Sequence, residues 1–179
     1  ITSFKDSKIS AELPLPAELL VGVAYEFDKW TVAFDYNHAF WNVYKSLDIN
    51  FEDESIPDSE NPRNYKNSSS YRFGAQYQLD DKIALRAGYY FDETPVQAGY
   101  FAPETPRGDS HNFTIGAGYN ISNNFRIDVA FLYIYFKEIN ESYDYYSEAG
   151  VVEDGAIVPF GGDWKTSGFV PSIGLTYRM

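Results

Sequence analysis

The protein has 179 residues, no cysteine, and 26 acidic against 14 basic residues, which gives a net charge of −12. This length indicates one domain, and the absence of cysteine excludes disulfides and thiolate metal sites. Because a nucleic-acid surface needs clustered lysine and arginine to neutralise phosphates, the acidic balance argues against nucleic acid as a partner.

Aromatic residues are frequent: 16 Tyr, 14 Phe and 3 Trp make up 18% of the chain. Tyrosine collects where a surface is apolar on one side and wet on the other, as at membrane interfaces. No run of about 18 consecutive apolar residues occurs, which excludes a spanning helix. A spanning β-barrel stays open, because alternating strands hide their lipid-facing half from any average hydropathy.

Seven segments alternate apolar residues with small or polar ones, which is the period of β-strands. In chain order they are residues 17–27, 30–51, 71–79, 83–91, 113–119, 125–135 and 169–177. Most have roughly the 9–11 residues that a tilted strand needs to cross a bilayer. The second segment is longer and its apolar phase changes. We therefore expect a bulge near residues 39–46 and a second half that projects beyond the bilayer.

The connections between these segments alternate in length. Tight turns are predicted at residues 28–29, 80–82 and 121–124, and long loops at about residues 52–69, 92–109 and 138–165. This alternation is typical of outer-membrane barrels, with short turns in the periplasm and long loops outside the cell. A soluble antiparallel barrel or sandwich would show the same alternation within its strands.

The small-or-polar face carries charge along several strands. Charged side chains suit a wet lumen better than a packed core, where an unpaired charge is costly, so they favour the membrane barrel. We expect them to brace the wall and dock a plug, with direct contact between an arginine and a ligand carboxylate as the alternative. Arg72 and Arg86 are expected at similar depth on adjacent strands. The candidate lumen residues are Glu18, Glu26, Asp35, Arg72, Arg86, Arg126 and Asp128.

The sequence contains no catalytic or metal-binding pattern. His38 and His111 are the only histidines, and neither has the spaced partners of a catalytic triad or a zinc site. We therefore expect neither an enzyme nor a cofactor.

Five short runs carry a family resemblance. They lie at residues 13–18 (LPLPAE), 71–74 (YRFG), 85–89 (LRAGY), 92–96 (DETPV) and 116–119 (GAGY). In this order and spacing they resemble the C-terminal half of the FadL/TodX family of outer-membrane transporters for long-chain fatty acids and other hydrophobic compounds. The resemblance extends from about residue 9 to Met179.

The resemblance implies an all-β fold, an antiparallel transmembrane β-barrel of fourteen strands in which these are the last seven. Residues 1–179 would then be the C-terminal part of a single barrel domain whose N-terminal plug and first strands are absent. The implied function is passive uptake of long-chain fatty acids or other hydrophobic small molecules across a bacterial outer membrane. The expected partners are outer-membrane lipid and the hydrophobic ligand, and the expected state is a monomer without a cofactor.

The end of the chain also resembles the signal read by the outer-membrane assembly machinery, which asks for a polar residue, a glycine and spaced hydrophobic residues. The matching residues are Ser172, Gly174, Tyr177 and Met179. A final phenylalanine is commoner at such ends, so Met179 departs from the pattern.

Two other functions are compatible with a barrel. If residues 1–13 form an eighth strand, the chain would be a small complete barrel that serves as an anchor or adhesion scaffold. Pro14 and Pro16, which follow at once, disfavour that strand. The charged face would also suit a general porin, which ion conductance would reveal.

Overall fold

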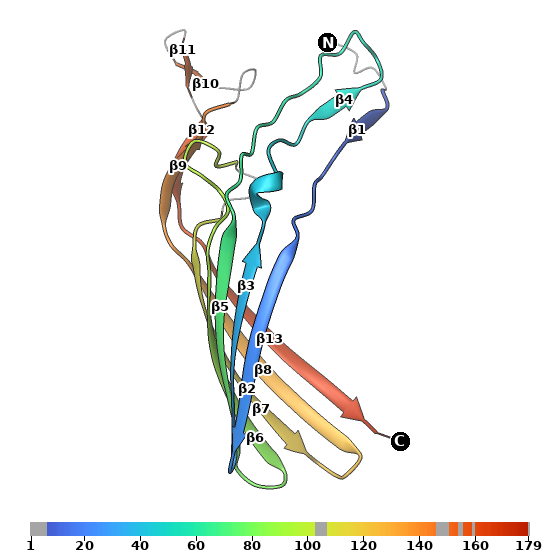
Figure 1. Cartoon of the computed structure of the whole chain (residues 1–179), viewed down its shortest axis with the longest axis vertical. Helices are drawn as coiled ribbons and strands as arrows, with labels where there is room; N and C mark the ends of the chain where they lie inside the picture. The colour runs from blue at the N-terminus through green and yellow to red at the C-terminus, as the bar shows by residue number, and fades with distance from the viewer. Residues whose placement is uncertain (1–6, 103–106, 146–150, 154–155, 159, 179) are drawn as a thin grey trace.

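The computed structural model describes residues 7–102, 107–145, 151–153, 156–158 and 160–178. Seven long strands form one antiparallel sheet in chain order, so each strand pairs with its nearest long neighbour (Figure 1). They are β2 (Glu18–Phe27), β3 (Trp30–Ala39), β5 (Ser68–Gln78), β6 (Ile83–Asp92), β7 (Ser110–Asn120), β8 (Phe125–Phe136) and β13 (Ser167–Tyr177). The seven predicted strands are confirmed, and the sheet curves like part of a barrel wall.

The predicted bulge in the second strand is wrong. β3 ends at Ala39 and is followed by a 3₁₀-helix, η1 (Trp41–Val43), and then by a separate short strand, β4 (Ile49–Phe51). The phase of the apolar residues changes because a helical turn intervenes, whereas a bulge would have kept the strand continuous. β4 leaves the sheet and pairs with β1 (Ile9–Ala11), and both project beyond its end, as expected for the second half of this segment (Figure 1).

Two further strand pairs lie at the same end of the sheet. β9 (Ile139–Tyr143) pairs with β12 (Phe160–Trp164), and this pair continues the direction of β8 and β13. The second pair is β10 (Val151–Glu153) with β11 (Ala156–Val158). The long connections therefore contain ordered strand pairs, all gathered at the end of the sheet opposite the short turns (Figure 1).

A polar residue stabilises each of the three short turns. Asp28 adopts a positive φ of 49° between β2 and β3, a conformation that aspartate tolerates better than most residues. The Asp80 carboxylate accepts the backbone N–H groups of Lys82 and Ile83, both at 2.8 Å, and these two bonds lower the pKa of Asp80. Ser122 Oγ accepts the N–H of Phe125 at 3.1 Å. These local bonds let the strands reverse within a few residues.

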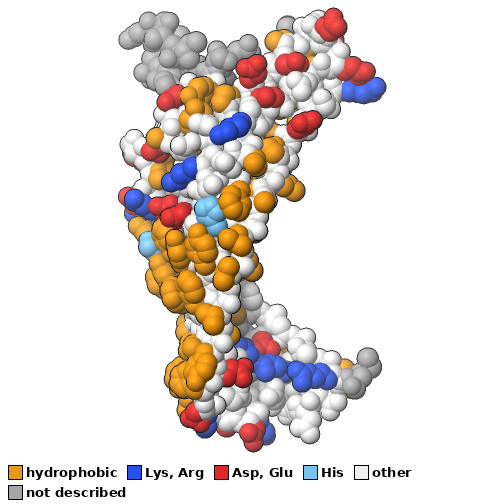
Figure 2. Space-filling model, in the orientation of Figure 1, with side chains coloured by type: hydrophobic (Ala, Val, Ile, Leu, Met, Phe, Trp, Pro, Cys, Tyr) orange, Lys and Arg blue, Asp and Glu red, His pale blue; other side chains and the backbone are white. Residues whose placement is uncertain are grey.

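The apolar face of the sheet points outward. Val21, Leu85 and Ile115 are 57%, 45% and 63% exposed, so they do not enclose a core. Figure 2 shows hydrophobic side chains gathered along one side of the sheet. Water would strongly disfavour a patch of this size, whereas acyl chains would solvate it. The outward orientation contradicts the soluble barrel or sandwich that the alternation alone left open. Within the described residues, no helix is long and apolar enough to cross a membrane.

The most deeply buried aromatic residues lie in the long connections. Tyr44, Tyr65, Phe101 and Tyr143 are 3–8% exposed. The rings of Tyr44 and Tyr65 pack edge to face at 4.9 Å between centroids. The Tyr143 hydroxyl donates to the Pro62 carbonyl at 3.0 Å, which ties two connections together. These contacts make a packed cap at one end of the sheet.

Candidate functional site

The seven candidate lumen residues all lie on the face opposite the apolar band, which is called here the inner wall. The register places glycine beside charge several times on this wall. Gly22 is the Cα partner of Asp35, and Gly118 and Gly174 flank Asp128 on its two neighbouring strands. A glycine has no side chain, so the neighbouring charged group can lie flat against the wall. Small residues therefore accompany charged ones on this face because they leave room for the charged side chains of the neighbouring strand.

Three of the candidates form one cluster near the short turns. Asp128 accepts hydrogen bonds from Arg86 Nη1 at 2.8 Å, from Arg126 Nε at 2.8 Å and from Arg126 Nη2 at 2.9 Å. Arg86 Nε also donates to Gln76 Oε1 at 2.8 Å. A Cβ at Gly118 would lie 2.5 Å from Asp128 Oδ1 and closer still to the Arg126 guanidinium. This cluster joins β5, β6 and β8 across the inner wall.

Asp35 and Arg72 do not pair, although they are Cα partners on β3 and β5. The Asp35 carboxylate turns toward β2, where it fills the space above Gly22. The Arg72 guanidinium turns the other way, with its carbon 6.0 Å from the centre of the Tyr90 ring. No ion pair to either residue exists within the part of the chain that the structure describes.

The other candidates differ in their surroundings. Glu18 Oε2 accepts a hydrogen bond from Asn37 Nδ2 at 3.4 Å. Glu26 faces Thr31 across β2 and β3 and is exposed. The expected similar depth of Arg72 and Arg86 is wrong. Arg72 pairs in register with Tyr90 and Arg86 with Gln76, so the two arginines lie four residues apart along the paired strands. Arg86 therefore lies closer to the short turns than Arg72 does.

Three cavities lie along the inner wall among the described residues. One of them, of about 370 Å³, lies at the short turns, where Arg126 and Arg178 line it. The other two lie further up the wall. The lower cavity, of about 370 Å³, is lined mainly by small residues of β3, β5 and β6, with charged groups around them. The upper cavity, of about 350 Å³, lies beneath the cap, where residues of the long connections close over the wall. Its apolar lining includes Trp41, Tyr65 and Val96. The upper cavity is thus built jointly by strands and loops.

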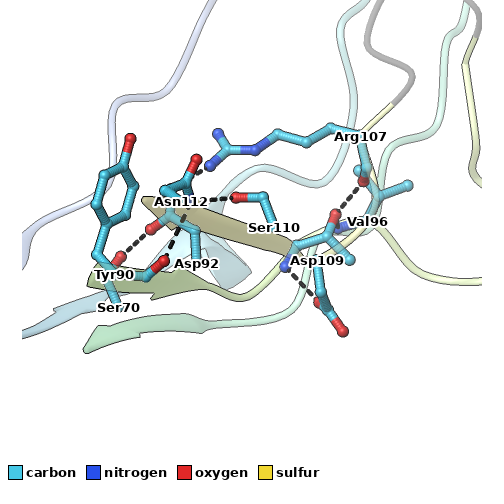
Figure 3. A network of polar contacts seen from close by, with 9 residues as sticks. Ser70, Tyr90, Asp92, Val96, Arg107, Asp109, Ser110 and Asn112 are labelled. Carbon is cyan, nitrogen blue, oxygen red and sulfur yellow. Dashed lines mark hydrogen bonds and ion pairs between the residues drawn. The ribbon is translucent and has the colours of Figure 1, made fainter. Parts of the chain in front are cut away.

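A polar network fixes one side of the upper cavity (Figure 3). Asp92 accepts hydrogen bonds from the Ser70 hydroxyl and from the Arg107 guanidinium, which reaches back from the long connection. Asn112 is 1% exposed, and its Nδ2 donates to Ser110 Oγ at 2.9 Å and to the Tyr90 carbonyl at 3.3 Å. A buried amide with both partners in place specifies a single arrangement of the wall.

A second tether runs along the same connection. Asp109 Oδ1 accepts the Thr94 N–H at 2.9 Å, and the Thr94 hydroxyl donates to the Arg107 carbonyl at 2.5 Å.

Sequence reasoning missed four residues of the upper cavity: Trp41, Tyr65, Asp92 and Arg107. They lie in or at the ends of long connections, where the sequence has no regular alternation from which the direction of a side chain could be predicted. Only the abundance of aromatic residues hinted at such a cap.

The candidate assembly residues lie at the last strand. Ser172 and Gly174 alternate with outward residues of β13, while Tyr177 is 68% exposed. Met179 lies outside the described residues.

The two histidines make hydrogen-bonding contacts with hydroxyl groups. His38 Nδ1 contacts the Ser69 hydroxyl at 3.0 Å, and His111 Nδ1 contacts the Tyr89 hydroxyl at 2.8 Å. In the described ranges, no group of three or more His, Asp or Glu residues could hold a metal ion.

Known proteins are similar to this chain in sequence and in fold. The model of the family described as "Outer membrane protein transport protein (OMPP1/FadL/TodX)" matches residues 2–178. The chain belongs to this family. The FadL/TodX resemblance found in the sequence is thereby confirmed, together with the antiparallel outer-membrane β-barrel fold and the outer-membrane location.

Individual FadL/TodX relatives agree. Outer membrane protein P1 of Haemophilus influenzae is 32% identical over 134 residues, which are 71% of this chain and 28% of that protein. The 47 kDa outer membrane protein of Pasteurella multocida is 25% identical over 134 residues, 74% of this chain and 31% of its own length. This chain therefore spans less than a third of the length of these curated relatives.

Solved FadL/TodX structures share the fold. A Pseudomonas aeruginosa FadL homologue has a TM-score of 0.80 at 24% identity, and the match covers 94% of this chain and 37% of the homologue. The Ralstonia pickettii toluene transporter TbuX has a TM-score of 0.52 at 28% identity, and the match covers 70% of this chain and 29% of TbuX.

Proposed function

We propose that this chain forms part of a channel for passive uptake of hydrophobic small molecules, long-chain fatty acids among them, across a bacterial outer membrane. The observation that carries the proposal is the upper and lower cavities on a charged inner wall, behind an outer face that is mostly apolar. A hydrophobic compound could occupy these cavities in turn and move down its concentration gradient. Such movement needs no cofactor.

The proposal includes a larger barrel. β2 and β13 are the edges of the seven-stranded sheet, and neither has a second long partner among the described strands. In lipid, the free backbone groups of an edge strand have no water to satisfy them, so further strands must pair there. We assign this chain to the C-terminal seven strands of a fourteen-stranded, monomeric barrel with an N-terminal plug. Long loops would face the medium, short turns the periplasm, and Ser172, Gly174, Tyr177 and Met179 the assembly machinery.

The eight-stranded alternative fits less well. It needed residues 1–13 to add a strand to the sheet, but Ile9–Ala11 pairs with β4 away from the sheet. The general porin remains the second candidate, because the inner wall is charged. A porin would conduct ions readily, whereas the packed cap over this wall favours a route that is closed to water.

Uptake by cells tests the proposal. Cells that make the intact protein should take up labelled oleate at a saturable rate above that of cells without it. Trp41→Ala removes an apolar wall of the upper cavity, and a loss of about 1 kcal/mol of contact would raise half-saturation roughly five-fold. Val43→Ala is the matched control, because Val43 lies in the same 3₁₀-helix but is 49% exposed outside that cavity. Uptake equal with and without the protein, or large ion conductance by the purified protein, would contradict the proposal.

A further inference from the structure

Arg72 is the one residue that lines both the upper and the lower cavity among the residues the structure describes. It lies near the middle of β5 on the inner wall, and its side chain is exposed. Any compound that moves along the wall from one cavity to the other therefore passes this guanidinium.

Among the described residues, the guanidinium of Arg72 has no ion pair with an acidic side chain. Its register neighbour Asp35 turns away over Gly22, and the guanidinium itself rests near the ring of Tyr90. By contrast, Arg86 and Arg126 share the Asp128 carboxylate within the described part of the wall. An arginine over an aromatic face keeps its N–H groups free to bind a planar anion.

The carboxylates of the upper cavity are already engaged. Glu18 accepts from Asn37, Asp92 from Ser70 and Arg107, and Glu93 accepts the Ser69 N–H at 2.9 Å. None of them has turned to neutralise Arg72. The upper cavity is lined by three acidic residues and by Arg72 and Arg107, whereas the lower one is lined by Asp35 with Arg72 and Arg86. The charged lining therefore becomes more positive from the upper to the lower cavity.

We propose that Arg72 is a specificity-determining residue, which binds the anionic headgroup of a hydrophobic compound as it passes from the upper to the lower cavity. This inference rests on the proposed function and assigns its selectivity to one side chain. A carboxylate can accept two parallel N–H bonds from the guanidinium, while the apolar tail remains among Trp41, Tyr65 and Val96. A neutral compound of the same length gains only the apolar contacts.

The test compares labelled dodecanoate with labelled dodecanol in cells that make the intact protein, after subtracting uptake by cells without it. Arg72→Met should lower the ratio of acid to alcohol uptake about ten-fold or more, because a charge-assisted hydrogen bond is lost. Arg72→Lys keeps the charge and should retain part of the ratio. Lys29→Met is the matched control: it removes a basic side chain at the short turn between β2 and β3 that lines neither cavity, so the ratio should stay unchanged.

The outcomes separate the two proposals. Entry of both compounds with an unaltered ratio in Arg72→Met would overturn the role of Arg72 and leave the channel proposal intact. An equal fall of the ratio in Lys29→Met would also overturn it, because the overall positive charge of the protein would then explain the selectivity. Entry of neither compound into cells with the unaltered protein would overturn the proposed function and this inference with it. Uptake in each strain is normalised to the amount of folded barrel, which is measured from its heat-modifiable mobility on a gel.

Discussion

The cluster around Asp128 yields a measurable prediction for stability. One carboxylate accepts three hydrogen bonds from two arginines, so Asp128→Asn removes the charge that holds Arg86 and Arg126 together. The side chains are partly wet: Arg86 is 39% exposed, Arg126 27% and Asp128 32%. Pairs this exposed contribute about 0.2–1 kcal/mol each, so two pairs should cost about 0.5–2 kcal/mol of unfolding free energy.

The assay is equilibrium urea unfolding of the intact protein in phospholipid vesicles, followed by tryptophan fluorescence. Glu26→Gln is the control, because it removes one inner-wall charge that has no ion pair among the described residues, and it should change stability by less than about 0.5 kcal/mol. High salt should shrink the effect of Asp128→Asn, since screening weakens partly exposed pairs. Equal losses in the two variants, or an effect that salt leaves unaltered, would refute the view that pairing across the wall stabilises the sheet.

Two other predictions concern the outer face and a short turn. Ile115 is 63% exposed on the outward face of β7, so Ile115→Arg should cost about 2–4 kcal/mol in vesicles, whereas Thr114→Arg on the inner face should cost about 1 kcal/mol or less. Equal costs would show that Ile115 does not meet acyl chains. At the turn, backbone bonds lower the pKa of Asp80, so the carboxylate stabilises the turn above the ordinary aspartate pKa, and this is lost as pH falls through the lowered value. Hydrogen exchange of Lys82 and Ile83, corrected for intrinsic rates, should then speed up on acidification and be fast at every pH in Asp80→Ala; protection independent of pH in the unaltered protein would contradict this.

The strands could be predicted from sequence because their signal is local. Alternation between Val21, Val23 and Tyr25 on one side and Gly22 and Ala24 on the other follows from the two-residue repeat of an extended chain. The short turns were also correct, because aspartate and serine satisfy neighbouring backbone N–H groups within three residues. The charged residues share the face opposite the apolar band, as their phase in the sequence predicted.

Local signals failed where the period broke. The phase change after Ala39 was read as a bulge, but a helical turn followed by a strand in another sheet produces the same change. Similar depth for Arg72 and Arg86 was also wrong, because depth depends on the register between β5 and β6, which alternation fixes only to within steps of two residues. The pairing of the inner-wall charges likewise depended on where neighbouring glycines left space.

The sequence by itself determined the strands, their turns and the face that meets lipid, because each depends on residues a few positions apart. Tertiary structure alone decided the cap, the return of Arg107 to Asp92 and the two cavities that meet at Arg72. These features join residues from separate strands and connections. Their geometry is set by long-range packing and by competition among several partners for each charge, and neither leaves a periodic trace in the chain.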